Sequence, residues 1–180
     1  MHKFVIIINY GDTSSNNISK ILHQLNISHI KCDPDIMPSY TQLSKLTHII
    51  LSGGPRHVYD EEDQLPLWVI EMNIPVLAIC YGMQLVAHHF GGKVVRHIKE
   101  KGIVHVIEII GNKVVDTPRW MNKYDKVLSI PEQFTITGIS ESNEISSFTD
   151  YKKWFCYQYH PEVELIDLTI FTSFLMIMNN

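Results

Sequence analysis

Short apolar runs punctuate the first half of the chain. Nearly every residue is apolar in Phe4–Ile8, His48–Ser52 and Pro75–Ile79. Such runs predict strands that are buried on both faces, as in a parallel sheet. A shorter and more polar strand is expected around Ile27–Lys31.

Helix signals lie between these strands. Asp12–Ser15 offers N-cap residues, and apolar residues follow at helical spacing through Leu25. Further helices are expected over about Asp63–Met72 and over Gly82–Phe90, the second closed by two glycines at its C-cap. Strands that alternate with helices predict a parallel sheet with right-handed crossovers.

The second half is richer in strands. They are predicted over Ile103–Ile110, Lys113–Val115, Phe134–Ile139, Ile145–Thr149 and Trp154–Tyr159, before an apolar helix over Leu165–Met178. The whole pattern predicts an α/β fold, with a central, mostly parallel sheet flanked by helices and with antiparallel additions. A length of 180 residues favours one domain over residues 1–180.

Composition narrows the function classes. The formal net charge of -4 gives no sign of a nucleic-acid surface or an anionic membrane partner. The apolar runs near both ends are too short, or too often interrupted, for a signal-peptide core or a membrane span. The three cysteines form an odd set without metal-ligand spacing, which is typical of thiols in a reducing compartment. We therefore expect a cytoplasmic protein.

The most informative chemistry lies where the Pro75–Ile79 run meets a helix. Cys80 stands at this junction, flanked by the small residues Ala78 and Gly82. A strand that turns sharply into a helix lifts the side chain above the sheet edge, as in a nucleophile elbow. The helix dipole favours a thiolate there, and the N–H of Tyr81 would face an oxyanion. A buried structural cysteine is the alternative.

A base for this thiol is offered further along the chain. His160 follows a predicted strand, Pro161 fixes the backbone after it, and Glu162 stands two residues on. A carboxylate that reaches an imidazole can hold its tautomer and stabilise the imidazolium. Cys, His and Glu together permit covalent acyl transfer. The other nine histidines lack such a neighbourhood and are expected to be surface or packing residues.

A glycine pair ends the His48–Ser52 strand, in the sequence Ser52-Gly53-Gly54-Pro55. Glycines at this place let backbone N–H groups approach a ligand closely, although an ordinary turn is the alternative. The segment lacks the Lys-Ser/Thr ending of a Walker ATP-binding loop.

Three segments together, in their order along the chain, resemble the class I glutamine amidotransferases. They are Ser52–Pro55, Ala78–Gly82 and His160–Glu162. That family joins a Gly-Gly-Pro or Gly-Pro-Gly loop, a Gly-x-Cys-x-Gly elbow and a His-Pro-Glu segment. The match spans nearly the whole chain. The resemblance implies that Cys80 is the nucleophile, His160 its base and Glu162 the partner that orients the base.

Within the family, the likeness is closest to the glutaminase part of GMP synthetase. That branch favours Leu-Ser-Gly-Gly-Pro, Cys-Tyr-Gly-Met-Gln-Leu and His-Pro-Glu-Val, all present here. By this resemblance Gly54 and Tyr81 donate the oxyanion-hole N–H groups, and Gln84 helps to hold the glutamine substrate. Asp125 matches the aspartate of the branch's Trp-Met-Ser-His-Gly-Asp-x-Val segment and is expected to contact substrate.

The resemblance implies no metal or organic cofactor in this chain. ATP and Mg²⁺ would belong to a partner, an ATP-pyrophosphatase subunit that converts XMP to GMP with the released ammonia. Such a synthetase carries a Ser-Gly-Gly-x-Asp-Ser loop. This loop is not supplied by Ser52–His57, and no tail of suitable length follows, so the synthetase is expected to be a separate chain.

Three segments depart from the branch. Ala78 replaces the first elbow glycine, Asn122–Tyr124 replaces Ser-His-Gly, and Lys99–Gly102 replaces Arg-Glu-Tyr-Gly. Three alternatives stay open. One is the glutaminase subunit of anthranilate or aminodeoxychorismate synthase, suggested by Asn9–Asp12. The others are a cysteine-elbow peptidase or stress protein and a non-catalytic, amidotransferase-like binding subunit.

A basic cluster follows the elbow helix. Its members are Lys93, Arg96, His97, Lys99 and Lys101, and Glu100 offsets their charge only in part. A solvated strand edge or loop would explain it, since exposed charges often have no partner. The functional interpretation is a face that steers an acidic patch of the synthetase subunit.

Overall fold

The computed structural model describes residues 2–59, 65–110, 112–163 and 168–178, and a nine-stranded sheet runs through them. One half is parallel, in the order β2-β1-β3-β4-β9. Its strands are β1 (Phe4–Ile8), β2 (Ser28–Cys32), β3 (His48–Leu51), β4 (Val76–Ile79) and β9 (Trp154–Tyr157). The sheet continues with antiparallel pairs through β8 (Ile145–Thr149), β7 (Thr135–Ser140), β5 (Lys93–Ile110) and β6 (Lys113–Ser129). The expected α/β fold is confirmed, with an antiparallel part larger than the sequence predicted.

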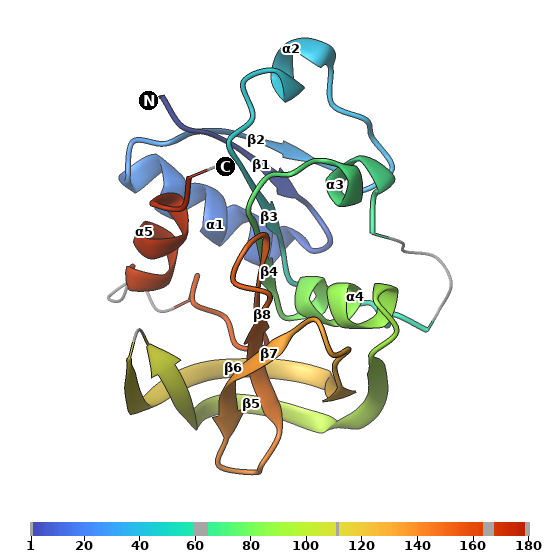
Figure 1. The fold of residues 1–180 in the computed structure, drawn as a ribbon, viewed down its shortest axis with the longest axis vertical. Helices are drawn as coiled ribbons and strands as arrows, with labels where there is room; N and C mark the ends of the chain where they lie inside the picture. Colours follow the sequence, from blue (N-terminus) through green and yellow to red (C-terminus); the bar gives the residue numbers. More distant parts are fainter. Residues whose placement is uncertain (1, 60–64, 111, 164–167, 179–180) are drawn as a thin grey trace.

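Helices cover both faces of the parallel half (Figure 1). One side carries α1 (Asp12–Gln24) and α5 (Thr169–Leu175), and the other carries α3 (Leu67–Glu71) and α4 (Tyr81–His89). The short α2 (Tyr40–Leu43), which the sequence pattern did not predict, lies between β2 and β3. Among the described residues, no helix has the length and apolar character needed to cross a membrane.

Two hydrophobic cores explain why the parallel strands are apolar on both faces. Side chains alternate along a strand, so Val5 and Ile7 of β1 pack in the core with α1 and α5. Ile6 and Ile8 point the other way, into the core that includes α3 and α4. All four side chains are fully buried. This arrangement fixes the carboxyl ends of the parallel strands at one edge of the sheet.

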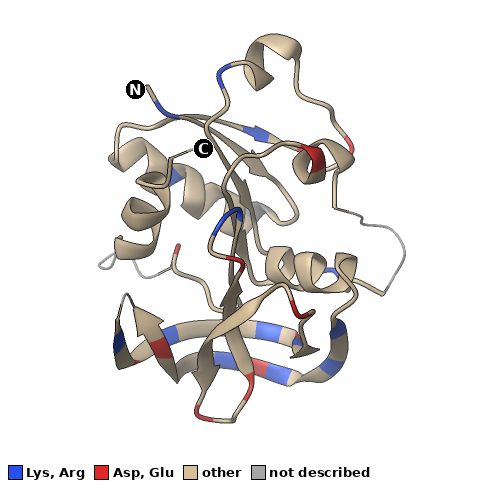
Figure 2. Cartoon of the chain, in the orientation of Figure 1, with Lys and Arg blue, Asp and Glu red and all other residues tan. Residues whose placement is uncertain are grey.

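A long hairpin, underestimated by the sequence pattern, lies across that edge. It consists of β5 (Lys93–Ile110) and β6 (Lys113–Ser129), whereas strands were predicted only over Ile103–Ile110 and Lys113–Val115. Figure 2 shows basic and acidic residues along both strands. Several of these charged side chains point inward and are buried, which hides the usual alternation of apolar and polar positions. They are Glu108, Arg119, Lys123 and Asp125.

Other predicted boundaries shift by small amounts. The N-cap of α1 is Gly11 rather than one of Asp12–Ser15, and it makes no side-chain cap bond. The last strand ends at Tyr157 instead of Tyr159. The helix predicted over Asp63–Met72 is α3, and the one predicted over Leu165–Met178 is α5. Parts of both predictions, residues 63–64 and 165–167, lie outside the described residues.

The remaining helices and strands match closely. The elbow helix α4 ends with Phe90 at its C-cap, and Gly91 follows with a φ of 91°, as expected for a C-terminal glycine. The two other sheet strands are β7 (Thr135–Ser140) and β8 (Ile145–Thr149).

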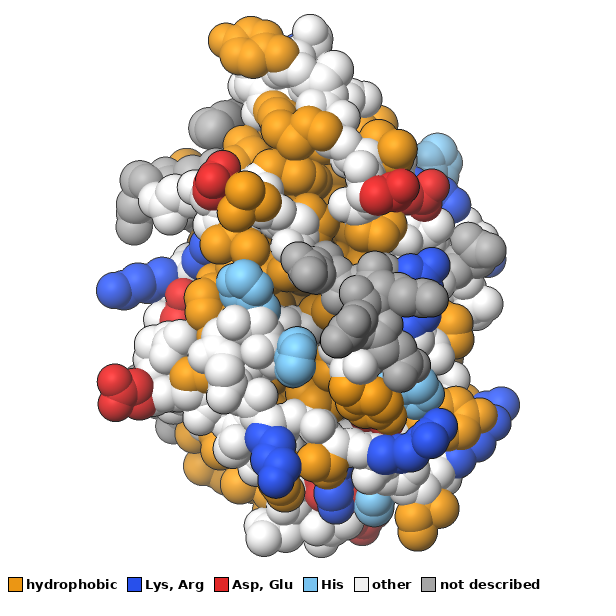
Figure 3. All heavy atoms as spheres, turned by 90° about the vertical axis from the view of Figure 1, so that its right-hand side faces the viewer, with side chains coloured by type: hydrophobic (Ala, Val, Ile, Leu, Met, Phe, Trp, Pro, Cys, Tyr) orange, Lys and Arg blue, Asp and Glu red, His pale blue; other side chains and the backbone are white. Residues whose placement is uncertain are grey.

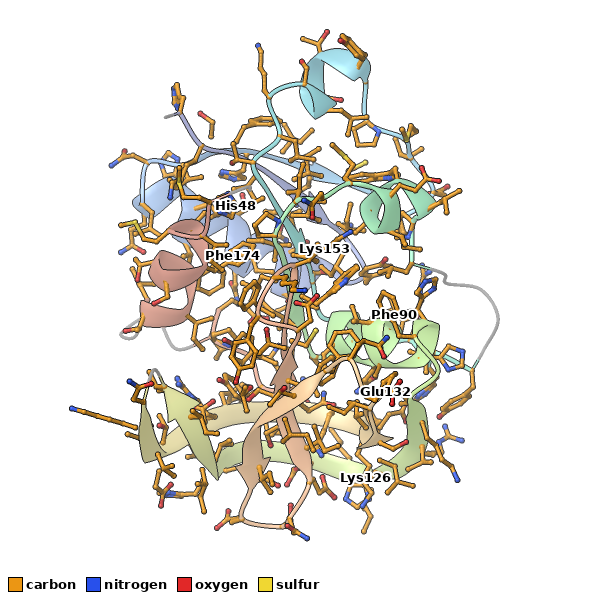
Figure 4. All side chains as sticks on the ribbon, in the orientation of Figure 1. His48, Phe90, Lys126, Glu132, Lys153 and Phe174 are labelled. Carbon is orange, nitrogen blue, oxygen red and sulfur yellow. The ribbon has the colours of Figure 1, made fainter. Side chains whose placement is uncertain are left out.

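His48 confirms the expectation of a packing histidine. It is 2% exposed, its Nε2 donates to the carbonyl of Ile177 at 3.1 Å, and its ring packs edge-on against Phe174 of α5 (Figure 4). Burial first, and the charge of Lys3 second, lower the pKa of His48 to about 4. This histidine is therefore neutral in the folded protein at pH 7.

Candidate active site

Cys80 occupies a strained turn between β4 and α4. Its φ of 49° and ψ of -105° lie in a region that non-glycine residues rarely adopt. Its N–H donates to the carbonyl of Tyr157 at 2.7 Å, and α4 begins at the next residue. At Gly82, an added Cβ would lie 2.7 Å from the Cβ of Leu51, so only glycine lets helix and strand approach this closely. The structure thus has the sharp strand-to-helix turn that the sequence predicts.

His160 and Glu162 lie together beside this turn. The Nδ1 atom of His160 is 2.8 Å from Oε1 of Glu162, and the carboxylate is only 1% exposed. The N–H of His160 donates to the carbonyl of Trp120 at 2.8 Å, so the hairpin helps to fix the histidine backbone. A carboxylate on Nδ1 leaves Nε2 as the ring nitrogen that can exchange a proton with a reacting group.

The carbonyl oxygen of Asn122 connects the histidine to the cysteine. It lies 3.3 Å from Nε2 of His160 and 3.7 Å from the sulfur of Cys80. A carbonyl and a carboxylate both accept hydrogen bonds only, so the two contacts of His160 are satisfied together by the imidazolium. Burial lowers the pKa of His160, but the charges of Cys80 and Glu162 and their hydrogen bonds outweigh it and raise that pKa well above its usual value.

The loop after β3 lies against the same group. A Cβ added at Gly53 would stand 2.9 Å from Cε1 of His160 and 3.5 Å from Cβ of Cys80. At Gly54 it would stand 2.5 Å from the carbonyl oxygen of Tyr10. Both glycines are therefore required by close approach, and the loop backbone lies next to Cys80. The oxyanion roles of Gly54 and Tyr81 stay predictions.

The two residues expected to bind substrate lie in a cleft with Cys80 and His160. Gln84 donates from Nε2 to Oε1 of Gln158 at 3.2 Å and to the carbonyl of Asp125 at 3.3 Å. Gln158 in turn donates to the sulfur of Cys80 at 3.6 Å. Gln84 is therefore linked to the thiol of Cys80 through the side chain of Gln158. Its contact with substrate stays a prediction.

Asp125 is bound by residues of the loop that follows β3. Its Oδ2 is 2.6 Å from Nδ1 of His57, and its Oδ1 accepts from the hydroxyl of Tyr59 at 3.2 Å. The rings of His57 and Tyr59 are stacked. His57 was expected to be a surface or packing residue, but it lines the cleft and pairs with a buried carboxylate. Folding alone brings His57 next to the carboxylate of Asp125, so the sequence carried no signal for this pair.

The cleft has a volume of about 1590 Å³. In the side view of Figure 3, apolar side chains gather in the upper part of the face, and basic side chains lie in the lower part. Four members of the predicted basic cluster are exposed on β5: Lys93, Arg96, Lys99 and Lys101. Lys101 also lines the cleft, so the cluster reaches the side of the molecule on which Cys80 lies. The fifth member, His97, is instead 3.2 Å from Oε1 of Glu144.

A buried ionic group between β5 and β6 lies next to the residues that hold His160. Arg119 donates to Oε2 of Glu108 from Nε at 3.1 Å and from Nη2 at 2.8 Å. The hydroxyl of Tyr159 donates to the other oxygen of Glu108. All three side chains are at most 3% exposed. Tyr159 directly precedes His160, and Arg119 directly precedes Trp120, whose carbonyl binds the His160 backbone.

The altered segment Asn122–Tyr124 has a structural role that its sequence did not reveal. The backbone carbonyl of Asn122 contacts both Cys80 and His160. Lys123 is buried, and its Nζ is paired with Glu144 and lies 3.2 Å from Glu100. Tyr124 lies with its ring 5.1 Å from Nζ of Lys99.

Comparison with known proteins identifies the same family as the motifs. The family model described as glutamine amidotransferase class-I matches residues 6–175. The GMP synthase [glutamine-hydrolyzing] of Thermotoga maritima is 37% identical over 165 residues, covering 88% of this chain and 32% of that protein. The corresponding protein of Aquifex aeolicus is 31% identical over 167 residues, covering 88% and 33%. The chain thus spans about a third of the length of these curated relatives.

Two solved structures have the same fold. A protein of Thermoplasma acidophilum, assigned as one subunit of GMP synthase, superposes with a TM-score of 0.83 at 25% identity. That match covers 97% of this chain and 93% of the other. A glutamine amidotransferase of Thermotoga maritima gives a TM-score of 0.75 at 25% identity, covering 90% and 77%.

Proposed function

This chain belongs to the class I glutamine amidotransferase family, and on that basis we propose that it hydrolyses glutamine to glutamate and ammonia through Cys80, His160 and Glu162. The observation that carries the proposal is the strained turn at Cys80 beside the buried His160–Glu162 pair. A strained nucleophile, a base and an orienting carboxylate are the parts that covalent acyl transfer requires.

The reaction would proceed in two halves. His160 takes the proton of Cys80, and the thiolate attacks the carboxamide carbon of glutamine. The raised pKa of His160 favours the state after this proton transfer. The N–H groups of Gly54 and Tyr81 would hold the tetrahedral oxyanion, and one such donor is worth about 3 kcal/mol of transition-state stabilisation.

The tetrahedral adduct then collapses. The imidazolium of His160 protonates the leaving ammonia, which breaks the C–N bond and leaves a glutamyl thioester on Cys80. Water, deprotonated by His160, attacks the thioester and releases glutamate and the thiol. Each step uses only this chain's own residues and water.

We propose further that the ammonia passes to an ATP-dependent synthetase subunit that converts XMP to GMP. Two likenesses support this acceptor. The chain is similar in sequence to glutamine-hydrolysing GMP synthases, of whose length it spans about a third. It is similar in structure to the Thermoplasma acidophilum protein assigned as a subunit of GMP synthase. ATP and Mg²⁺ would act on the synthetase, which we propose to be a separate chain.

Labelling with a diazo-ketone analogue of glutamine tests the nucleophile. The analogue is expected to modify Cys80, which lines the cleft, and to spare Cys32 and Cys156. Burial raises the pKa of the Cys32 thiol, and it raises that of Cys156 well above its usual value, so neither forms a thiolate readily. Peptide mapping that found the label mainly on Cys32 or Cys156 would refute the assignment.

Reconstitution with the synthetase tests the division of labour. Cys80→Ala is expected to abolish glutamine-dependent GMP formation and to leave ammonium-dependent formation intact, because the thiol serves only to release ammonia. Cys32→Ser is the matched control and should retain both activities. Equal loss of both activities in the Cys80 variant would instead make Cys80 a structural or interface residue.

A further inference from the structure

Ser14 lies at the centre of the candidate active site, although no motif pointed to it. It belongs to the first turn of α1, is 8% exposed, and lines the cleft. Its hydroxyl donates to Oε1 of Glu162 at 2.6 Å and accepts the N–H of Gly53 at 3.0 Å. Ser14 therefore joins α1, the glycine loop and the carboxylate of the candidate triad.

The geometry leaves the hydroxyl one orientation. A serine hydroxyl has a single proton, and its oxygen accepts the N–H of Gly53. That proton is therefore directed at Glu162, which as a carboxylate can only accept. The result is a continuous chain of contacts from Gly53 through Ser14 and Glu162 to Nδ1 of His160.

Glu162 depends on these contacts for its orientation. Both hydrogen bonds that hold its carboxylate, from Ser14 and from His160, end on Oε1. Within the described part of the chain, the buried Oε2 has no hydrogen-bond partner. Without the bond from Ser14, the carboxylate of Glu162 would keep only its bond to His160. Glu162 could then orient His160 less firmly. The N–H of Gly53, next to the predicted oxyanion donor Gly54, would also lose its partner.

We propose that Ser14 is a positioning residue for glutamine hydrolysis, which acts through Glu162 and couples the triad to the oxyanion loop. The proposal rests on the proposed function of this site. The hydroxyl of Ser14 is hydrogen-bonded to Glu162 and to the N–H of Gly53, and these bonds involve neither the sulfur of Cys80 nor the N–H of Gly54. Its effect should therefore appear in the turnover rate and only weakly in the affinity for glutamine.

The test compares two serines of the same helix. Ser14→Ala is expected to lower kcat for glutamine hydrolysis about 10- to 100-fold, because small displacements of catalytic groups have effects of this size. KM should change by no more than about twofold, since ground-state binding is untouched. Ser15→Ala is the matched control. Ser15 is fully buried and donates to Oδ1 of Asn9 at 2.8 Å, so its variant loses a similar hydrogen bond away from Glu162.

Two further variants separate positioning from folding. Rates are expressed per site titrated with the diazo-ketone analogue, so that only folded enzyme is counted. Ser14→Thr keeps the hydroxyl and should retain kcat within about threefold, because the donor to Glu162 remains. In a Glu162→Gln background, Ser14→Ala should have almost no further effect, since residues that act as a unit are not additive.

Three results would overturn the proposal: an unchanged kcat per titrated site in Ser14→Ala, an equal loss in Ser15→Ala, or the same fold-loss in both Glu162 backgrounds. The same variants are also tested for the rate at which iodoacetamide alkylates Cys80, which does not require glutamine turnover. An inactive wild-type enzyme would refute the proposed function. The alkylation rates would still decide the role of Ser14, being slower in Ser14→Ala and unchanged in Ser15→Ala if it is correct.

Discussion

Replacing Glu108 by leucine should be among the most destabilising single changes in the hairpin. Glu108 accepts two hydrogen bonds from Arg119 and one from the hydroxyl of Tyr159, and all three side chains are buried. The change breaks the buried ion pair between Glu108 and Arg119 by removing one partner, which costs about 3–5 kcal/mol. The unpaired hydroxyl of Tyr159 adds about 1–3 kcal/mol. We therefore expect a loss of roughly 4–8 kcal/mol in the free energy of unfolding, a large share of the 5–15 kcal/mol typical of whole domains.

Urea unfolding at pH 7, followed by far-UV circular dichroism, measures this loss. The triple variant Glu108→Leu/Arg119→Met/Tyr159→Phe replaces the whole polar group by apolar side chains of similar size. It should recover most of the stability, because buried ion pairs replaced together by apolar residues are often neutral. Tyr157→Phe, next to this group, is the control and should change stability by less than about 1 kcal/mol. A single Glu108→Leu variant that lost under about 1 kcal/mol, or a triple variant no more stable than the single one, would contradict the reasoning.

Three further predictions concern the elbow, pH and docking. Gly82→Ala should cost about 1–3 kcal/mol of stability and lower kcat by up to about 100-fold. The Cβ of the new alanine would stand 2.7 Å from the Cβ of Leu51 and push α4 away from β3. A wild-type kcat in this variant would contradict the need for close approach. His48 has a pKa of about 4 when folded and about 6.5 when unfolded, so the unfolded chain binds more protons between these values. Its contribution to stability should therefore fall as pH drops from 6.5 to 4, by at most about 3 kcal/mol, and urea titrations of His48→Gln should lack this component. Charge reversal at Arg96 and Lys99 should slow association with the synthetase more at low salt than at high salt, while stopped-flow rates that stay unchanged at low salt would exclude a docking role.

The sequence predicted the parallel half of the fold well, for a simple physical reason. Strands buried on both faces must be apolar at every position, so Phe4–Ile8 and His48–Ser52 stand out from their surroundings. Only the turn end of the hairpin gave a strand signal, over Ile103–Ile110 and Lys113–Val115. The part of β6 that was not predicted has Arg119 and Lys123 at inward positions, and their charges are compatible with burial because each has a carboxylate partner in the folded chain. A pattern that counts apolar residues does not recognise the part of a strand whose inward positions are charged.

By itself the sequence determined the turn at Cys80. A buried strand, small flanking residues and an immediate helix are local properties, and they force the strained backbone that the structure has. The tertiary structure alone decided what surrounds the sulfur. The Asn122 carbonyl is a backbone atom, present at every residue, so no side-chain identity could mark it. The hydroxyl of Ser14 reaches Glu162 across 148 positions of sequence, because α1 and the His160 segment meet at the same edge of the sheet. Contacts of this kind depend on where helices, strands and loops meet. The 2.6 Å hydrogen bond between Ser14 and Glu162 therefore exists only in the folded chain.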